Sequence, residues 1–248
     1  MKPDYISVPD WELLLKKYPN KEELLDKLTN YPPQYLIGNV EFLGQTISVD
    51  ERVLIPRFET ELLVDKTIKY VKELFNKKIN VIDLGTGSGC IAIALKNNLD
   101  ANVTALDISK DALDLAKENA KLNNAEITFI HKSMTDDLQN SYDIIISNPP
   151  YIPYDGFVEE KVKKTEPNIA LFADNNGLYF YEEILNKHLS HLNSPGLIAF
   201  EIGDNQKALL EELVSKLNLK YSFENDLQGL PRYLFIFKWI NIKKTNHH

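Results

Sequence analysis

From Lys78 onward, short apolar runs alternate with longer segments whose apolar residues recur at helical spacing. Short apolar runs between helical segments are typical of strands that are buried on both faces. The runs predicted as strands are 79–84, 102–106, 127–130, 142–147, 197–202, 221–224 and 233–239. The segments predicted as helices are 90–97, 110–122, 178–192 and 206–216.

Strands that alternate with helices favour a parallel sheet, because each helix returns the chain to the edge where the next parallel strand begins. Such crossovers are right-handed, and their helices cover both faces of the sheet. The last two strands are joined by a polar loop at 226–231, which is too short for a crossover helix. We therefore predict an α/β fold with a doubly wound, seven-stranded, mostly parallel sheet whose last strand is antiparallel.

The first residues of the chain predict a small helical part at 1–30. Residues 10–18 carry one apolar stripe at helical spacing, and Asp10 is in place to cap that helix. The stripe consists of Trp11, Leu14, Leu15 and Tyr18. A second short helix is predicted over 21–28. Two such helices are too small to fold alone, so we expect them to pack on the next segment of the chain.

That next segment, at 31–56, is predicted to be a structured linker. Tyr31-Pro32-Pro33 ends the helical pattern, and residues 40–53 then alternate around Gly44-Gln45 as in a β-hairpin. The residues expected to face inward are Phe42, Ile47 and Val49. A proline-led turn at 54–61 opens a helix and begins the main domain, which we place at 57–246.

A glycine-rich loop, Asp83-Leu84-Gly85-Thr86-Gly87-Ser88-Gly89, lies between the first strand of this domain and its helix. A doubly wound sheet binds nucleoside cofactors at this position, and glycines let a ligand approach the backbone closely. The G-x-G-x-G spacing differs from that of dinucleotide-binding loops, which favours a cofactor without a pyrophosphate. Asp107 ends the second strand, where its carboxylate can accept from both hydroxyls of a ribose.

A second unusual stretch, Asn148-Pro149-Pro150-Tyr151, comes directly after the apolar run at 142–147. The two prolines donate no hydrogen bonds and stiffen the backbone. The side-chain oxygen of Asn148 and the carbonyl of Pro149 can both accept from one planar –NH₂ group, on which Tyr151 can pack. Taken alone, this stretch also fits an ordinary turn after a strand. Because the glycine loop, Asp107 and this stretch share the carboxyl edge of one sheet, we interpret them as one site.

Composition excludes several other classes of protein. The chain has 248 residues, a net charge of −8 and no apolar run of the roughly 18 residues that span a membrane. Without a secretory signal pattern either, the sequence favours a cytoplasmic protein. The net negative charge disfavours a broad surface that binds nucleic acid. The one cysteine, Cys90, excludes an internal disulfide and is expected to be buried, and no spaced ligand set indicates a metal site. His247 and His248 resemble the remnant of an affinity tag.

The sequence resembles the S-adenosylmethionine-dependent methyltransferases, and among them the glutamine-N5 methyltransferases that modify peptide chain release factors. The resemblance covers most of the chain. Its motifs are PPQYLIG at 32–38, LIPRFETE at 54–61, DLGTGSG at 83–89, ALDIS at 105–109, SNPPYIP at 147–153, Glu166-Pro167 with Ala170-Leu171, and EIGDNQ at 201–206. Asn-Pro-Pro-Tyr alone also occurs in adenine-N6 and some guanine-N2 methyltransferases of nucleic acids, so the combination of motifs carries the specificity.

The resemblance implies a class I methyltransferase fold, S-adenosyl-L-methionine as cofactor, and a glutamine in the GGQ loop of a release factor as substrate. It implies that the methionyl part of the cofactor lies against Gly85, Thr86, Gly87, Ser88 and Gly89, and the ribose against Asp107. The remaining cofactor contacts that it implies are Thr60, Glu61, Met134 and Asn148. The substrate glutamine falls on Asn148, Pro149, Pro150 and Tyr151, of which Asn148, Pro149 and Tyr151 are the predicted catalytic residues.

Three features depart from the family pattern. Phe58 replaces the central proline of PRPETE, which should alter the stiffness of the loop rather than its chemistry. Ser133 and Met134 stand where an aspartate and a tryptophan are common near the adenine, although methionine can also cover an aromatic face. The N-terminal helical part, which the resemblance implies is the part that docks the substrate, is shorter than usual.

The predicted chemistry needs positioning more than it needs a base. An amide nitrogen is a poor nucleophile, and two acceptors on its N–H bonds hold it in line with the methyl group and favour pyramidalisation. Alignment of this kind lowers the activation barrier by up to about 7–11 kcal/mol. Acceptors aimed at the charge that develops on nitrogen add about 3 kcal/mol, by analogy with a single oxyanion-hole donor. The proton can leave to water after attack.

Two rival functions use the same sequence features. An adenine-N6 or guanine-N2 methyltransferase would bind the –NH₂ group of a nucleobase, and it would need a flipped or single-stranded base. Acidic balance and the lack of a target-recognition domain count against it. A cofactor-binding module without catalytic activity is the other rival, and the intact stretch from Asn148 to Tyr151 counts against that interpretation.

Overall fold

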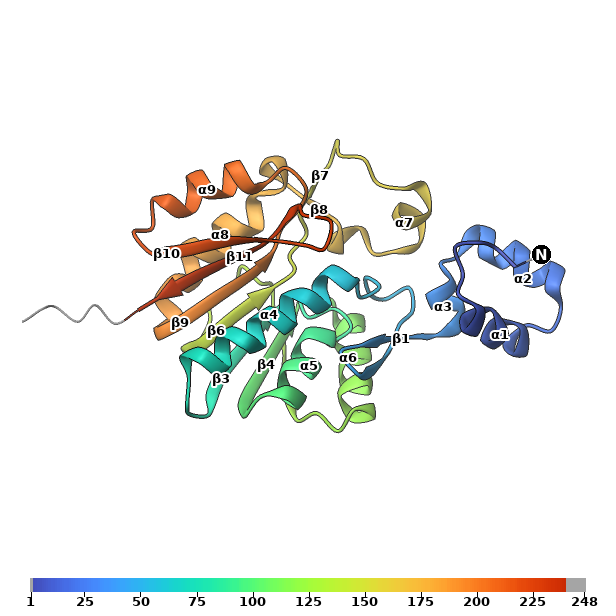
Figure 1. The fold of residues 1–248 in the computed structure, drawn as a ribbon, viewed down its shortest axis with the longest axis horizontal. Coiled ribbons are helices and arrows are strands. Elements are labelled where there is room, and N and C mark those ends of the chain that lie inside the picture. The colour runs from blue at the N-terminus through green and yellow to red at the C-terminus, as the bar shows by residue number, and fades with distance from the viewer. Residues whose placement is uncertain (1, 240–248) are drawn as a thin grey trace, which may run out of the picture.

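The computed structural model describes residues 2–239, and the predicted tag residues His247 and His248 lie outside them. Near the N-terminus, α1 (Val8–Lys17), α2 (Lys21–Asn30) and α3 (Pro33–Ile37) enclose a small apolar cluster of their own. Its buried members are Ile6, Trp11, Leu14, Leu24, Leu28 and Leu36. Figure 1 shows these helices at one end of the molecule, beyond the hairpin that leads into the main sheet.

Two predictions for this part are wrong in detail. The cap of α1 is Ser7, not Asp10, because the Ser7 hydroxyl accepts from the Asp10 backbone N–H at 3.1 Å. The helix α3 is not predicted, because two adjacent prolines after Tyr31 carry only the signal of a helix breaker. Pro33 occupies the first turn of α3, where backbone N–H groups have no partner within the helix, so the missing N–H of proline costs no hydrogen bond.

The predicted hairpin is confirmed as β1 (Asn39–Phe42) and β2 (Gln45–Ser48). Phe42, Ile47 and Val49 are buried as predicted. Asn119 of α6 (Lys110–Leu122) fastens the hairpin to the main body, since its side chain accepts from Ser48 N at 2.8 Å and donates to Ser48 O at 3.0 Å. These two bonds therefore hold the hairpin against the sheet domain.

The main sheet has seven strands in the order β10-β11-β9-β6-β3-β4-β5, and only β11 runs antiparallel to the others. The predicted doubly wound, seven-stranded and mostly parallel sheet, with its last strand antiparallel, is therefore confirmed. The strands are β3 (Ile79–Leu84), β4 (Ala101–Asp107), β5 (Ile127–His131), β6 (Tyr142–Ser147), β9 (Leu192–Glu201), β10 (Lys220–Asn225) and β11 (Pro231–Lys238). Besides α6, the helices that cover the sheet are α4 (Phe58–Leu74), α5 (Cys90–Asn98), α8 (Tyr179–His188) and α9 (Lys207–Ser215).

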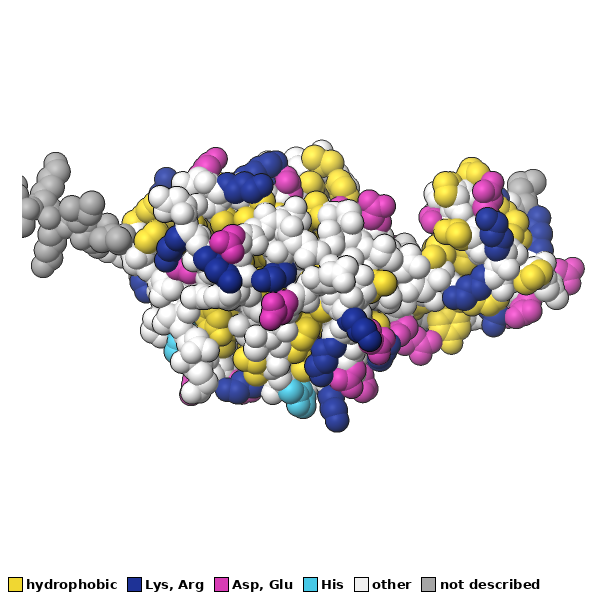
Figure 2. All heavy atoms as spheres, turned by 90° about the horizontal axis from the view of Figure 1, so that it is seen from below, with side chains coloured by type: hydrophobic (Ala, Val, Ile, Leu, Met, Phe, Trp, Pro, Cys, Tyr) yellow, Lys and Arg dark blue, Asp and Glu magenta, His cyan; other side chains and the backbone are white. Residues whose placement is uncertain are grey.

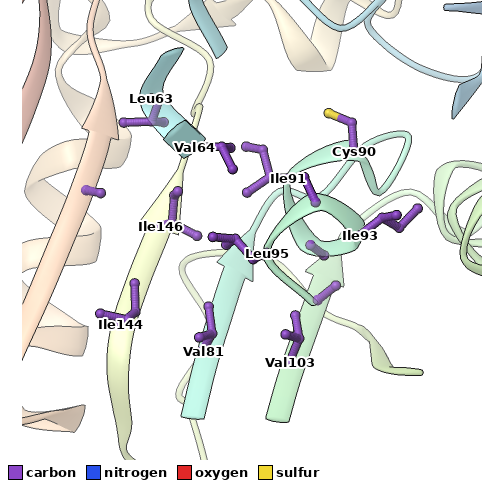
Figure 3. Packing of buried hydrophobic residues seen from close by; sticks show 14 of the residues in the cluster. Leu63, Val64, Val81, Cys90, Ile91, Ile93, Leu95, Val103, Ile144 and Ile146 are labelled. Carbon is purple, nitrogen blue, oxygen red and sulfur yellow. The ribbon is translucent and has the colours of Figure 1, made fainter. Parts of the chain in front are cut away.

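Two apolar layers bury the two faces of the sheet, which explains why its central strands are apolar without interruption. Val81 and Ile144 face α4 and α5, whereas their neighbours Ile82 and Ile145 belong to the layer under α8 and α9. Figure 3 shows Leu63 and Val64 of α4 and Leu95 of α5 in the same apolar layer as Val81 and Ile144. Cys90 is buried in the first layer, as predicted.

The strand order reverses beside β3, because β4 and β5 extend the sheet on one side of it and β6 and β9 on the other. Ligands bind at such a switch point, outside the carboxyl ends of the strands. The connection from β6 to α8 spans this region with short elements that were not predicted. They are β7 (Ile152–Pro153), α7 (Glu160–Thr165), η1 (Asn168–Ala170), β8 (Phe172–Ala173) and η2 (Asn175–Gly177). We call residues 152–177 the insertion.

One predicted boundary is wrong by several residues. The helix predicted over 178–192 ends at His188, is followed by η3 (Leu189–His191), and β9 already begins at Leu192. Asn193, Ser194 and Pro195 carry no apolar pattern, yet they extend β9 toward the start of β6, where Leu192 pairs with Tyr142.

The surface in Figure 2 carries basic and acidic side chains intermingled over the sheet domain, with a hollow between that domain and the N-terminal helices. Within residues 2–239, no helix is long and apolar enough to cross a membrane. The same part of the chain contains no group of three or more His, Cys, Asp or Glu side chains arranged to hold a metal ion.

Candidate active site

The glycine loop turns sharply at the end of β3. Gly85, Gly87 and Gly89 have φ values of 76°, 53° and 83°, a region that other residues rarely adopt. A Cβ atom on Gly85 would lie 2.5 Å from Cε of Met134, so a side chain at this position would fill the space between the glycine loop and Met134, which we call the cradle. Thr86 braces the loop from behind, because its hydroxyl donates to Asp83 Oδ2 at 2.6 Å.

Asp107 holds the same loop from the end of β4. Its Oδ2 accepts from Gly87 N at 2.8 Å, and its Oδ1 accepts from Ser109 N at 2.8 Å. Each carboxylate oxygen can accept a second hydrogen bond, so Asp107 retains two acceptors for a pair of hydroxyls. Burial raises the pKa of this carboxyl group, and the hydrogen bonds from the Ser109 and Gly87 amides oppose that rise.

A cavity over the carboxyl edge of the sheet, which we call the cofactor cavity, brings together six of the thirteen predicted positions. Six of its lining residues come from three strand ends and the loop after β5: Gly85, Gly87, Asp107, Met134, Asn148 and Pro150. Thr86, Ser88 and Gly89 shape the loop without lining this cavity. The cofactor roles of all these residues stay predictions.

Apolar residues that were not predicted form another wall of the cofactor cavity. Ile108 comes directly after Asp107 and is 52% exposed, whereas Phe180 comes from α8 and Ile169 from the insertion. The signal that could have indicated Ile108 is an apolar residue directly after the strand end that carries the expected ribose ligand. No comparable signal indicates Phe180, because its place depends on the path of the insertion.

Met134 reaches the cofactor cavity from the loop after β5, beside Ser133. Its backbone carbonyl lies 2.7 Å from Nε2 of the buried His188, which fixes the loop on α8. Burial is the main reason why the pKa of His188 is lowered, so its ring is held neutral. The backbone of Met134 is therefore held in place, whereas the contact of its side chain with an adenine face stays a prediction.

A second, smaller cavity adjoins the first, and we call it the substrate cavity. It is lined by Leu54, Arg57, Asn148, Tyr151, Ile152, Val162, Ala170, Leu171 and Glu201. Asn148, Leu54 and Ala170 line both cavities. The side chain of Asn148 thus stands where a cofactor in one cavity and a substrate in the other would meet.

The EIGDNQ motif holds Tyr151 in the substrate cavity. The side-chain amide of Gln206 donates to the Tyr151 carbonyl at 3.2 Å, and it accepts from Gly203 N at 2.8 Å through its oxygen. A Cβ atom on Gly203 would lie 2.8 Å from the Tyr151 ring, so only glycine leaves room for it. Burial raises the pKa of the Tyr151 hydroxyl, which stays protonated.

Thr60 and Glu61, predicted over the cofactor, line neither cavity. The Thr60 hydroxyl is buried between two side chains, accepting from Asn148 Nδ2 at 3.1 Å and donating to Glu201 Oε2 at 2.6 Å. Glu61 lies beside Leu43 of the hairpin turn, and burial raises its pKa. Their predicted contacts with the cofactor stay predictions.

Glu166 ties the insertion to the LIPRFETE segment. Its buried carboxylate accepts from Arg57 Nη2 at 2.6 Å and from Ile55 N at 3.1 Å. This contact explains why Glu166-Pro167 accompanies LIPRFETE among the family motifs. It also forms one wall of the substrate cavity, because Arg57 lines that cavity.

We predict that Glu166→Ala lowers the free energy of unfolding by about 3 kcal/mol, because it leaves Arg57 and the Ile55 amide without their acceptor. Denaturant unfolding measures the loss. Glu160→Ala is the matched control: its pair with Lys164 is exposed, with an N···O distance of 3.5 Å, and its loss should cost less than about 1 kcal/mol. Equal losses for the two variants would show that the buried contact is not the stronger one.

The class of the protein is defined by this fold and site. The family model described as methyltransferase small domain matches residues 60–165. A crystal structure of a methyltransferase from Pyrococcus furiosus has a TM-score of 0.59 at 19% identity, covering 79% of this chain and 90% of that one. The cradle at Gly85 and the free acceptors of Asp107 fit a nucleoside with a hydroxyl pair. The protein is an S-adenosylmethionine-dependent methyltransferase.

Curated relatives define the family within this class. The release factor glutamine methyltransferase of Lactococcus lactis is 42% identical over 212 residues, which are 84% of this chain and 77% of that protein. The release factor glutamine methyltransferase of Flavobacterium psychrophilum is 38% identical over 242 residues, which are 94% of this chain and 82% of that protein. This chain belongs to the release factor glutamine methyltransferase family, so the resemblance carried by its motifs is confirmed.

Proposed function

We propose that this chain transfers a methyl group from S-adenosylmethionine to the side-chain amide nitrogen of a glutamine in a peptide chain release factor. The observation that carries the assignment is the place of Asn148, whose amide stands at the junction of the cofactor cavity and the substrate cavity. Two relatives that match this chain over most of their own length are named release factor glutamine methyltransferase. We place the reaction in the cytoplasm, where release factors act.

The residues of the chain perform three tasks in this reaction. The glycine loop and Asp107 hold the cofactor, whose sulfonium supplies an electrophilic methyl group. Asn148 Oδ1 and the Pro149 carbonyl accept from the two N–H bonds of the glutamine, which removes orientational entropy worth up to about 7–11 kcal/mol. Tyr151 packs on the plane of the same amide, and Pro150, which lines the cofactor cavity, is the other substrate-binding residue that we propose.

The proton lost from nitrogen needs no strong base within the site. Nitrogen becomes acidic only after it has attacked the methyl group, and water can then take the proton. No histidine is among the residues described as lining either cavity. The acceptors aimed at nitrogen contribute about 3 kcal/mol to stabilisation of the developing charge.

The N-terminal helical part at 1–30 and the linker at 31–56 are proposed to dock the release factor on the main domain at 57–246. The helical part also contacts the insertion, since Lys161 Nζ of α7 donates to the Leu28 carbonyl of α2. The substrate protein would then bind across the hollow visible in Figure 2. We expect no stable nucleic-acid binding.

A transfer assay with labelled cofactor tests the proposed function. The protein is incubated separately with release factor, with RNA and with DNA, and the label in each is counted. We expect label in the release factor alone, and none when the glutamine of its GGQ loop is replaced by asparagine. Label in RNA or DNA with an unlabelled release factor would establish the nucleobase alternative instead.

A further inference from the structure

A buried chain of hydrogen bonds connects Asn148 to Glu201 at the carboxyl end of the neighbouring strand β9. Asn148 Nδ2 donates to Thr60 Oγ1 at 3.1 Å, and the Thr60 hydroxyl donates to Glu201 Oε2 at 2.6 Å. Thr60 is 3% exposed and Glu201 is 2% exposed, so water does not compete with these bonds. Thr60 comes from α4 and Glu201 from the carboxyl end of β9, both of which are rigid elements.

We propose that Thr60 and Glu201 are positioning residues that orient the amide of Asn148 so that its oxygen faces the substrate. This inference rests on the proposed function and deepens it. The number of available donors fixes the orientation. An ionised Glu201 only accepts, and a threonine hydroxyl has one proton to donate. Because the Thr60 hydroxyl donates its proton to Glu201, it can only accept a hydrogen bond from Asn148. The nitrogen of the Asn148 amide must therefore face Thr60.

The opposite atom of the amide is thereby left free for the substrate. Within residues 2–239, no protein donor forms a hydrogen bond to Asn148 Oδ1. An asparagine turned by 180° would present an N–H donor to the substrate amide and would repel the N–H bonds that it has to accept from. Positioning by Thr60 therefore decides whether the site contains an acceptor or a donor.

Protonation of Glu201 should reverse the direction of both hydrogen bonds in this chain. A protonated carboxyl group donates to Thr60, whose own proton then turns toward Asn148 and selects the flipped amide. Burial raises the pKa of Glu201 to about 7, and the hydrogen bond from Thr60 opposes that rise. The charged groups that face it are Arg232 of β11, Arg57 before α4 and Glu59 of α4. Acid therefore favours the inactive orientation, and the active one is lost as pH falls through about 7.

The first test removes the Thr60 hydroxyl at constant volume. We expect Thr60→Val to lower kcat for release factor on the order of 100-fold, the size of effect seen when one preorganised polar contact is lost. Cofactor affinity, measured by calorimetry, should stay within about threefold. Thr60→Ser restores the hydroxyl and should recover about tenfold or more of the lost activity. Thr67→Val is the matched control, because Thr67 is a buried threonine of α4 that donates only to Leu63 O of its own helix.

The second test uses the pH profile and does not depend on the fold of the Thr60 variants. With saturating cofactor, wild-type kcat should fall about tenfold per pH unit below the pKa of Glu201, and Glu201→Gln should lack this limb. Asp83 also has a pKa raised by burial to about 7, but it braces the glycine loop, so its protonation should change cofactor affinity instead.

The outcomes separate this inference from the proposed function. A wild-type protein that methylates no release factor would overturn the proposed function and the inference with it. An active wild type with a fully active Thr60→Val variant would overturn the inference alone. So would a Thr60→Val variant that loses cofactor affinity, or a Glu201→Gln variant that keeps the wild-type acid limb.

Discussion

Replacing Asn148 by alanine is expected to lower kcat for release factor by at least about 100- to 1,000-fold, while the cofactor Kd stays within a few-fold. The variant loses the side-chain acceptor that holds the glutamine nitrogen in line with the methyl group, and alignment is the largest contribution that this site can make. Cofactor affinity should survive, because Asp107 and the glycine loop are held by bonds in which Asn148 takes no part. Single-turnover kinetics and calorimetry on the same preparation measure both quantities.

A suitable control for Asn148→Ala is Asn102→Ala. Asn102 lies near the amino end of β4, on the opposite edge of the same sheet, where its exposed side chain donates to Asn80. Its loss should leave kcat and the cofactor Kd unchanged. A folded Asn148→Ala protein that no longer binds the cofactor would contradict the assignment and make Asn148 a cofactor residue first.

Replacing Asp107 by alanine is expected to have the reverse effect, raising the cofactor Kd by about 100-fold or more. A hydrogen bond to a charged group contributes about 1.5–3 kcal/mol, and Asp107 offers two free acceptors to the ribose. The variant also frees Gly87 N and Ser109 N, which loosens the loop that the methionyl part would lie against. With cofactor at saturation, kcat should fall much less than it does in Asn148→Ala.

The control for Asp107→Ala is Asp111→Ala, which removes an exposed carboxylate from the first turn of α6. It changes the charge of the same region without touching the glycine loop. Thermal melting of both variants checks that the fold is retained. Unchanged cofactor affinity in a folded Asp107→Ala protein would remove the ribose assignment.

Much of the sheet domain could be predicted because its sequence pattern has a single interpretation. The bounds predicted for β3, β6 and α6 are those of the structure, since each is an uninterrupted apolar run or a clear amphipathic repeat between turn residues. The convergence of Gly85, Asp107 and Asn148 could also be predicted from the sequence, because the carboxyl ends of neighbouring parallel strands meet at one edge.

The parts that were missed share a physical cause, which is that short or long-range contacts leave no periodic signal. The insertion at 152–177 consists of two-residue strands and single turns, so Ile169 could not be placed in the cofactor cavity. The bond between Thr60 and Glu201 joins residues 141 positions apart. Resemblance indicated that both their motifs matter, but only the fold places both residues in one hydrogen-bonded chain with Asn148.

The central claim is that the chain methylates the side-chain amide of one glutamine in a release factor. The most direct measurement is to incubate the protein with release factor and S-adenosylmethionine, digest the product, and locate the added methyl group by peptide mass spectrometry. The structure and its relatives predict one methyl group, on the glutamine of the GGQ loop, that is absent when Asn148→Ala replaces the wild type. A methyl group on any other residue, or an unmodified release factor beside methylated RNA or DNA, would contradict the claim.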